Sequence, residues 1–332
     1  MRAWIVPAGC TDPAALRVES RPEPVAGPGQ IVVRVRAASL NYRDQAVVRG
    51  QYFGGATPRD LIPGSDGAGD VLSVGAGVTS VAVGDRVAGT FFQPMPSGPA
   101  ALGSPLDGVF TEQAVFADGG VVRLPESIGY EAAACLPCAG VTAWHALFGV
   151  GRPIAPGDTV LVLGTGGVSM LALQLARAAG ARVIATSSSD DKLERAFALG
   201  ATDGINYART PEWEREVVRI TGGRGVDCVV EIGGAGTLGR SYQSLARGGK
   251  VALIGFLAGP QGDTAPHPLM MKAGQLYGVF VGDRPMFEAL LRAVAFNRIA
   301  PPVDRVFAFD DVAAAYAYQA ARRFVGKIVI RF

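Results

Sequence analysis

The stretch TVLVLGTGGVSMLALQLARAAG, residues Thr159 to Gly180, decides the fold of the second half of this chain. It begins as an apolar, β-branched run, passes through three glycines and goes on with the spacing of a helix. Such a turn from strand to helix directs backbone N–H groups and the positive end of the helix dipole toward an anion. The stretch therefore predicts a loop that holds the pyrophosphate of a dinucleotide, with an ordinary turn as the alternative.

The residues of this loop have distinct expected roles. Gly164 allows the tight turn, and the next glycine lets the phosphates approach the main chain. A third glycine would pack the helix against the strand, but Ser169 stands at that position. We expect this serine to move the helix slightly away from the strand and to leave the anion site intact. The predicted cofactor contacts of the loop are Gly164, Thr165, Gly166, Gly167 and Val168.

An alternation of strands and helices surrounds the loop. Candidate strands are TVLVLG, RVIAT, DGINY, VDCVVEI and KVALIGF, and helices are expected over residues 189–199 and 211–221. Alternation of this kind builds an α/β fold with a doubly wound parallel sheet that carries helices on both faces.

The polar residues after the second of these strands indicate which dinucleotide binds. An NAD site usually offers a carboxylate to the ribose hydroxyls about twenty residues after the glycine loop. Here Ser187 and Ser188 occupy the strand end, and Lys192 follows one helical turn later. Hydroxyl groups do not repel a 2′-phosphate, and a lysine attracts one. The sequence therefore favours NADPH.

Two alternatives remain open at this strand end. Ser189 can simply cap the following helix while Lys192 is solvated, although capping and phosphate binding are compatible. Asp190 and Asp191 would erase the preference if either carboxylate turned toward the ribose. As first-turn residues of a helix they are instead expected to favour its dipole.

The rest of the chain suggests a second domain, since 332 residues exceed what one hydrophobic core usually fills. Residues 30–89 carry short β-branched runs cut by glycine and are expected to form a small all-β unit. The prolines and glycines of residues 90–108 predict a long loop without a regular element. Residues 285–296 and 309–322 are expected helices, KIVIRF is an expected final strand, and these last elements are candidates to rejoin the first domain.

Composition excludes several classes of partner. The formal net charge is +2, with 49% hydrophobic and 18% charged residues, and basic residues are scattered rather than interleaved with aromatic ones. We therefore expect a cytoplasmic globular protein with no nucleic acid partner and no membrane segment. The four cysteines are expected to be reduced, and Cys135 and Cys138 form a lone C-x-x-C motif that is best interpreted as two small buried residues.

Several segments together resemble the medium-chain dehydrogenase/reductase superfamily, which comprises zinc alcohol dehydrogenases and zinc-free quinone oxidoreductases. They are NYRD at Asn41, PGSDGAGDVLSVGAGVTSVAVGDRV at Pro63, LPCAGVTAWHAL at Leu136, the glycine loop, and GGKVALIG at Gly248. The resemblance covers nearly the whole chain. It implies a GroES-like β-barrel catalytic domain over residues 1–126 and 282–332, and a Rossmann dinucleotide-binding domain over residues 127–281.

The resemblance also locates the zinc ligands of the family, and this chain lacks most of them. By motif position the three catalytic ligands correspond to Asn41, Ser65 and Cys138. Amide and hydroxyl groups bind zinc poorly, and the proline-rich loop has no cysteine for a structural zinc. We therefore expect no metal. Of the two histidines, His145 lies in an apolar helical stretch and is expected to be packed or hydrogen-bonded there, with a substrate or cofactor contact as the alternative.

Chemistry without zinc favours a conjugated substrate. Hydride added to the β-carbon of an enone or quinone places negative charge on a conjugated oxygen, which a few hydrogen-bond donors stabilise. The resemblance places Asn41 and Tyr42 beside the nicotinamide as such donors, with Ser65 as a third. Proton return is assigned to tyrosine or water. Asp44 and Asp66 are expected to be structural partners of arginines or loop amides.

The resemblance implies further contacts with the cofactor and with a partner subunit. Tyr207 and Arg322 are expected at the adenosine end. A homodimer is expected through the edge strand of the dinucleotide sheet near Tyr277. Other residues expected to contact the cofactor are Thr142, Ile254, Gly255, Phe256, Phe280 and Val281.

The function predicted is a zinc-independent, NADPH-dependent reductase of an activated alkene or a quinone. One alternative is a metal-free alcohol dehydrogenase or carbonyl reductase. Another is an NADPH-binding protein with vestigial activity. Turnover with enones but not with simple ketones separates the first from the second, and tight binding without turnover indicates the third.

Overall fold

The structure, a computed structural model, describes residues 1–259 and 261–332 and forms two compact units. The first unit is Met1–Ala139 with Asp283–Phe332, and the second is Gly140–Gly282. The sequence predicts the first boundary between the two domains after residue 126. In the structure α2 (Tyr130–Ala134) contacts β3 and β4 of the first unit, so the change of unit comes later.

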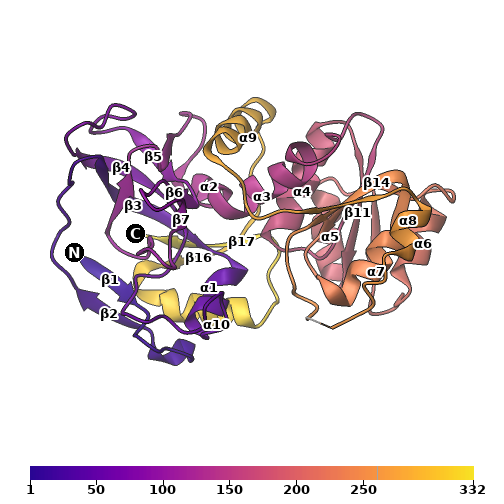
Figure 1. Cartoon of the computed structure of the whole chain (residues 1–332), viewed down its shortest axis with the longest axis horizontal. Coiled ribbons are helices and arrows are strands. Elements are labelled where there is room, and N and C mark those ends of the chain that lie inside the picture. Colours follow the sequence, from indigo (N-terminus) through magenta and orange to yellow (C-terminus); the bar gives the residue numbers. More distant parts are fainter. Residues whose placement is uncertain (260) are drawn as a thin grey trace. The chain divides into compact units, whose positions relative to one another are not determined.

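A six-stranded parallel sheet forms the centre of the second unit (Figure 1). Its strands are β10 (Thr159–Val162), β11 (Arg182–Ser187), β12 (Asp203–Asn206), β13 (Val226–Glu231), β14 (Leu245–Leu253) and β15 (Gln275–Gly278). The order across the sheet is β12-β11-β10-β13-β14-β15, and every neighbouring pair is parallel. The order of strands therefore reverses between β10 and β13, where doubly wound sheets bind ligands at the carboxyl ends of the strands.

Helices cover both faces of this sheet, as the alternating pattern predicted. They are α3 (Val141–Trp144), α4 (Gly167–Ala178), α5 (Asp190–Ala198), α6 (Trp213–Ile220), α7 (Ala235–Ser244) and α8 (His267–Met271), with a π-helical turn over His145–Gly149. Trp213 of α6 and Tyr242 of α7 pack with Val229 of β13. The neighbouring Cys228 approaches the carbonyl of Ala146 instead, because successive strand residues point to opposite faces.

The first unit is rich in β structure. Its largest sheet contains β3 (Gln30–Leu40), β4 (Asp66–Val74), β5 (Arg86–Gly89), β8 (Gln113–Ala117), β9 (Val121–Arg123), β16 (Val303–Ala308) and β17 (Lys327–Arg331). β1 (Arg2–Ile5) and β2 (Arg17–Ser20) form a separate antiparallel pair. The helical elements are α1 (Tyr42–Val48), α2, α9 (Arg284–Asn297) and α10 (Val312–Ala320), with 3₁₀ turns at Pro13–Ala15 and Phe309–Asp311 and a π-helical turn at Leu136–Gly140.

The expectation that residues 90–108 contain no regular element is wrong. Two short strands, β6 (Phe92–Gln93) and β7 (Ala100–Ala101), pair in antiparallel fashion within this loop. The pairing is possible because the prolines lie between and after the paired residues, where no ladder hydrogen bond is lost.

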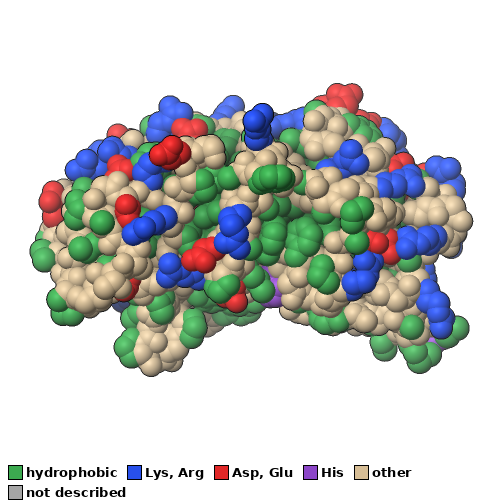
Figure 2. Space-filling model, turned by 90° about the horizontal axis from the view of Figure 1, so that it is seen from above, with side chains coloured by type: hydrophobic (Ala, Val, Ile, Leu, Met, Phe, Trp, Pro, Cys, Tyr) green, Lys and Arg blue, Asp and Glu red, His purple; other side chains and the backbone are tan. Residues whose placement is uncertain are grey.

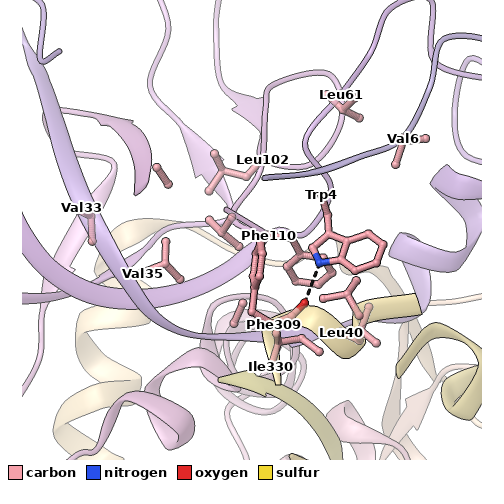
Figure 3. Packing of buried hydrophobic residues seen from close by; sticks show 14 of the residues in the cluster. Trp4, Val6, Val33, Val35, Leu40, Leu61, Leu102, Phe110, Phe309 and Ile330 are labelled. Atoms are coloured by element: carbon pink, nitrogen blue, oxygen red, sulfur yellow. Dashed lines mark hydrogen bonds between the residues drawn. The ribbon is translucent and has the colours of Figure 1, made fainter. Parts of the chain in front are cut away.

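The C-terminal segment shares the core of the first unit. Trp4 of β1 and Phe309 belong to the same buried cluster, together with Phe110 (Figure 3). The indole Nε1 of Trp4 donates to the carbonyl of Phe309 at 2.7 Å, which satisfies a polar atom in an otherwise apolar core. Residues from the two ends of the chain therefore stabilise one unit.

The surface carries charges of both signs. On the face seen in Figure 2, lysine and arginine side chains are interspersed with aspartate and glutamate, rather than gathered in a single basic stripe. None of the helices formed by the described residues has the length and apolar character that spanning a membrane would require.

Candidate functional site

The glycine loop lies at the carboxyl end of β10, and its glycines are required for different reasons. Gly164 has φ +68°, a left-handed conformation that glycine adopts at low cost. Gly166 precedes α4 with φ −77° and ψ −178°, an extended backbone that any residue adopts. A Cβ atom added to Gly166 would meet no atom of the protein within 4 Å. Neither backbone nor packing explains a glycine at 166, whereas a ligand phosphate close to the main chain does.

Ser169 forms a hydrogen bond between the start of α4 and the end of β10. Its side chain is fully buried, and Oγ donates to the carbonyl oxygen of Leu163 at 2.6 Å. Leu163 directly follows β10, so the hydroxyl links the first turn of the helix to the end of the strand. The residue that replaces the third glycine thus supplies a bond that glycine cannot.

The ends of β11 and β12 bring together the residues expected at the adenosine end. Ser187 is buried and accepts a hydrogen bond from the Ser189 N–H at 3.3 Å, and Ser188 is exposed. The backbone N–H of Tyr207 donates to the Ser187 carbonyl at 2.9 Å. The Tyr207 side chain is 42% exposed, and Lys192 lies half-buried in the first turn of α5.

Asp190, the first residue of α5, is held by two side chains that were not predicted as its partners. Its carboxylate accepts from the Asn206 amide at 2.8 Å and from both terminal nitrogens of Arg209. The hydrogen bond from Arg209 is the main reason that the pKa of Asp190 lies below its usual range. Both partners lie in GINYAR, residues 204–209, where only Tyr207 was predicted to contact the cofactor.

The remaining cofactor candidates of the second unit follow β14 (Ile254, Gly255, Phe256) and β15 (Phe280, Val281), except for Thr142, which lies in α3. The N–H of Ile254 donates to the Glu231 carbonyl at 2.8 Å. A Cβ on Gly255 would come within 2.8 Å of the Ile232 carbonyl, so close packing explains this glycine. Phe256 and Phe280 are more than half exposed, and Thr142 in α3 is buried.

Val281 has a strained backbone that a histidine supports. Its φ of +54° is rare for a β-branched residue. Nδ1 of His145 lies 2.8 Å from the Val281 carbonyl oxygen, which can only accept, so this nitrogen carries the hydrogen. His145 is therefore hydrogen-bonded, as the sequence indicated, and it holds a predicted cofactor residue in place.

In the first unit, a buried polar network surrounds Asn41, the residue that precedes α1. The Asn41 amide nitrogen donates to Ser65 Oγ at 3.3 Å, and Ser65 Oγ donates to Asp66 Oδ1 at 3.1 Å. Ser65 and Asp66 are fully buried, and Asn41 is 8% exposed. The single hydroxyl hydrogen of Ser65 is used within the network, so we assign it to positioning rather than to donation toward a substrate.

Lys327 completes this network from the far end of the sequence. Its Nζ donates to Asn41 Oδ1 at 2.5 Å and to the Leu40 carbonyl at 2.8 Å, and lies 3.7 Å from Asp66 Oδ2. Burial raises the pKa of Asp66, and the Lys327 ammonium opposes that rise. Lys327 was not predicted as a site residue, because nothing in a single final strand marks its lysine as buried.

Two neighbours of Asn41 differ sharply in exposure. The Tyr42 side chain is 54% exposed, which suits a residue that meets a substrate. Asp44 is 1% exposed and accepts from the Asn41 N–H at 2.7 Å, which confirms the expected structural role of a carboxylate beside loop amides. Burial raises the pKa of Asp44 to about 6, although Arg43 opposes the rise.

The donor set around Asn41 does not suit zinc. Within residues 1–259 and 261–332, no three His, Cys, Asp or Glu side chains gather in a group that could hold a metal ion. The Cys138 N–H donates to Asp66 Oδ2 at 3.1 Å, and burial raises the pKa of the Cys138 thiol well above its usual range. Burial raises the pKa of Cys135 to about 12. In the metal-free protein both cysteines of the C-x-x-C motif are therefore thiols and not thiolates, which does not favour redox exchange.

The candidate residues thus form two groups. The second unit brings together the glycine loop, Ser187, Ser188 and Tyr207 at the carboxyl ends of adjacent strands. The first unit brings together Asn41, Ser65 and the unpredicted Lys327. Arg322 follows α10 in the first unit with φ +54°, and its assignment to the adenosine end stays a prediction.

Comparisons with known proteins find related sequences along most of the chain. Residues 27–126 match the alcohol dehydrogenase GroES-like domain, and residues 167–295 match the zinc-binding dehydrogenase family. A zinc-type alcohol dehydrogenase-like protein of Schizosaccharomyces pombe is 42% identical over 92% of this chain and 91% of its own length. Quinone oxidoreductase-like protein 2 of Rattus norvegicus is 30% identical over 94% of this chain and 87% of its own.

Solved structures share the same fold. An NAD-dependent alcohol dehydrogenase is 32% identical with a TM-score of 0.90, over 100% of both chains. The crotonyl-CoA carboxylase/reductase AntE in complex with NADP is 25% identical with a TM-score of 0.90, over 100% of this chain and 94% of its own. Proteins of this fold thus include both NAD-dependent and NADP-bound examples.

Proposed function

Because this chain belongs to the medium-chain dehydrogenase/reductase superfamily, an oxidoreductase family that binds nicotinamide dinucleotides, we propose that it is an NADPH-dependent reductase of enones or quinones that works without a metal. The observation that carries the proposal is the network of Asn41, Ser65, Asp66 and Lys327. It supplies hydrogen-bond donors and one buried cation, but no set of zinc ligands.

The residues of the glycine loop suit a bound dinucleotide. Gly166 keeps the approach to the main chain clear, and the first N–H groups of α4 have no partner within their own helix. These groups and the dipole of a twelve-residue helix would hold the pyrophosphate. When bound, the reduced nicotinamide supplies a hydride.

The preference for NADPH is supported by the charges at the end of β11. The strand ends in serine, and the first acidic residue that follows it in the sequence, Asp190, is already bound by Asn206 and Arg209. A 2′-phosphate would therefore meet the hydroxyl groups of Ser187 and Ser188 and the ammonium of Lys192, while Arg209 keeps the Asp190 carboxylate occupied. Charge-assisted hydrogen bonds contribute about 1.5 to 3 kcal/mol each, so two of them predict a preference on the order of a hundredfold.

The donors of the first unit fit the reduction of a conjugated carbonyl. We assign the Asn41 amide and the Tyr42 hydroxyl to the substrate oxygen, on which negative charge develops as hydride reaches the β-carbon. In an enone or quinone this charge is delocalised, so hydrogen bonds suffice where an isolated ketone would need a Lewis acid. Tyr42 or water returns the proton.

A homodimer is also part of the proposal. β15 is the edge strand of the parallel sheet and pairs only with β14 among the described strands. Four side chains on and near it, Met270, Met271, Leu276 and Phe280, are between 40% and 67% exposed. An unpaired edge with exposed apolar side chains invites pairing with a second copy.

The cofactor assignment is tested by comparing kcat/KM for NADPH and NADH in the wild type, Lys192→Ala and Arg209→Gln. We expect the wild type to prefer NADPH by about a hundredfold, and both variants to lower the ratio. Arg209→Gln should also improve NADH use, because it releases Asp190 toward the ribose. Arg219→Gln, which removes a surface arginine bound to Glu216, serves as the control. Equal use of the two cofactors by the wild type would reject the assignment.

A further inference from the structure

We propose that Lys327 is the positioning residue of the Asn41 site, and that its ammonium fixes the amide so that the N–H₂ group is the side presented as a donor. The inference deepens the proposed function, since it rests on Asn41 acting as a donor to a substrate oxygen. The ammonium of Lys327 has no part in the hydride and proton transfers proposed above, and the orientation of Asn41 gives it a role.

The fold delivers Lys327 to Asn41 by strand register. β17 pairs with β3 in antiparallel fashion, with Ile328 opposite Leu40, so the residue before Ile328 meets the residue after Leu40. Lys327 is 2% exposed there, and its Nζ lies 2.5 Å from Asn41 Oδ1. Its position is therefore set by the backbone and not by a flexible surface side chain.

The chemistry of the ammonium determines which way the amide faces. An ammonium group has three donors and no acceptor, so the Asn41 atom in contact with it must be the oxygen. A flipped amide would place Nδ2 against Nζ, two donors at hydrogen-bond distance. The orientation of the amide therefore follows from the chemistry of its partner.

The rest of the network reinforces this orientation. Ser65 uses its one hydrogen on Asp66 at 3.1 Å, so its oxygen is left to accept from Asn41 Nδ2 at 3.3 Å. Asp66, fully buried and 3.7 Å from Nζ, balances the charge of the lysine. A positive charge at the amide oxygen also withdraws electron density from the nitrogen, which makes its N–H groups stronger donors.

A buried charge pair is costly to assemble and stabilises a fold weakly, so its presence beside a functional amide points to orientation. The chain offers a contrasting case in Lys250 of β14. This lysine is 4% exposed, and its Nζ donates to the carbonyls of Leu147, Val150 and Arg152. Three backbone carbonyls give Lys250 a purely structural role, which makes it a matched control.

Kinetics test the role of Lys327 through Asn41. We expect Lys327→Met to lower kcat for an enone or quinone about 100-fold with the KM for NADPH unchanged, as loss of one oriented donor does. Lys250→Met should lower the melting temperature without changing kcat. Because Lys327→Met leaves Asp66 buried without its cation, the variant Lys327→Met/Asp66→Asn is measured as well and should show the same loss of kcat.

A double-mutant cycle distinguishes action through Asn41 from general damage. If Lys327 acts by orienting the amide, Asn41→Ala and Lys327→Met together should cost about the same 100-fold as either alone. Independent effects would multiply to about 10,000-fold and would overturn the inference, as would an unchanged kcat in Lys327→Met.

A measurement without turnover keeps this inference separate from the proposed function. The chain has three asparagines, Asn41, Asn206 and Asn297, so protein labelled with ¹⁵N only at asparagine gives three side-chain amide signals in NMR. We expect Lys327→Met, which adds no asparagine, to shift the Asn41 signal and speed its hydrogen exchange at least tenfold, with the other two unchanged. An unchanged Asn41 signal rejects the role of Lys327, whereas a wild type that binds NADPH but reduces no enone or quinone rejects the proposed function alone.

Discussion

At the scale of single residues, Gly166 connects the sequence to cofactor binding most directly. Its extended backbone and the open space around its Cβ position mean that alanine should fit without loss of stability. The added methyl group would instead obstruct phosphates at the main chain. We expect Gly166→Ala to weaken NADPH binding at least tenfold in a fluorescence titration while the melting temperature stays within a degree or so.

Gly129 provides the control for that variant. It also precedes a helix, has φ −72° and ψ 161°, and has no protein atom within 4 Å of an added Cβ. Gly129→Ala should leave both the melting temperature and NADPH affinity unchanged. Normal NADPH affinity in Gly166→Ala would show that the open space serves no ligand.

Asp44 gives a prediction about pH dependence. Burial raises its pKa from 3.8 to about 6, so the folded protein binds more protons at this group than the unfolded chain between those values. Stability therefore falls as pH rises through that window, by up to about 3 kcal/mol from this group alone. Asp44→Asn should remove this dependence.

The difference in unfolding free energy between Asp44→Asn and the wild type isolates this effect from other titrating groups. Urea unfolding between pH 4 and pH 7 should show the difference shifting in favour of the variant as pH rises. A constant difference would mean that folding does not raise the pKa of Asp44, and a shift in favour of the wild type would mean that its surroundings stabilise the carboxylate.

At the scale of elements, Ser169 joins α4 to the end of β10. The bond from its buried hydroxyl to the Leu163 carbonyl would be lost in Ser169→Gly, and a glycine within a helix is itself unfavourable. We expect a loss of about 2 kcal/mol in the free energy of unfolding. If serine were merely tolerated where glycine is preferred, the same variant would be neutral or more stable.

The elements also show where sequence reasoning succeeds. β10 to β14 and the helices α4, α5 and α6 were predictable, because apolar runs and glycine turns are local signals. The bond between Lys327 and Asn41 spans 286 residues, and the pairing of β17 with β3 that creates it has no local signal. Arg209 was missed for a similar reason, since its effect on Asp190 depends on the register of β11 and β12.

At the scale of the whole molecule, we expect two copies to associate through β15. Light scattering after size-exclusion chromatography should give the mass of two chains. Leu276→Lys, which places a charge on a 40% exposed position of this edge strand, should shift the mass toward one chain. Val115→Lys, at a 36% exposed strand position of the first unit, should leave the dimer intact. A monomeric wild type at micromolar concentration would contradict the proposed interface.

The proposed function of the molecule is the reduction of conjugated carbonyls with NADPH and without a metal. The most direct test follows NADPH oxidation by chelator-treated protein of measured zinc content, with a quinone, an enone, an aldehyde and a simple ketone as substrates. We predict turnover of the quinone or enone at less than 0.1 zinc per chain, with kcat/KM on the order of a hundredfold above that for the simple ketone. One retained zinc per chain, or equal or greater activity toward the simple ketone, would contradict the account.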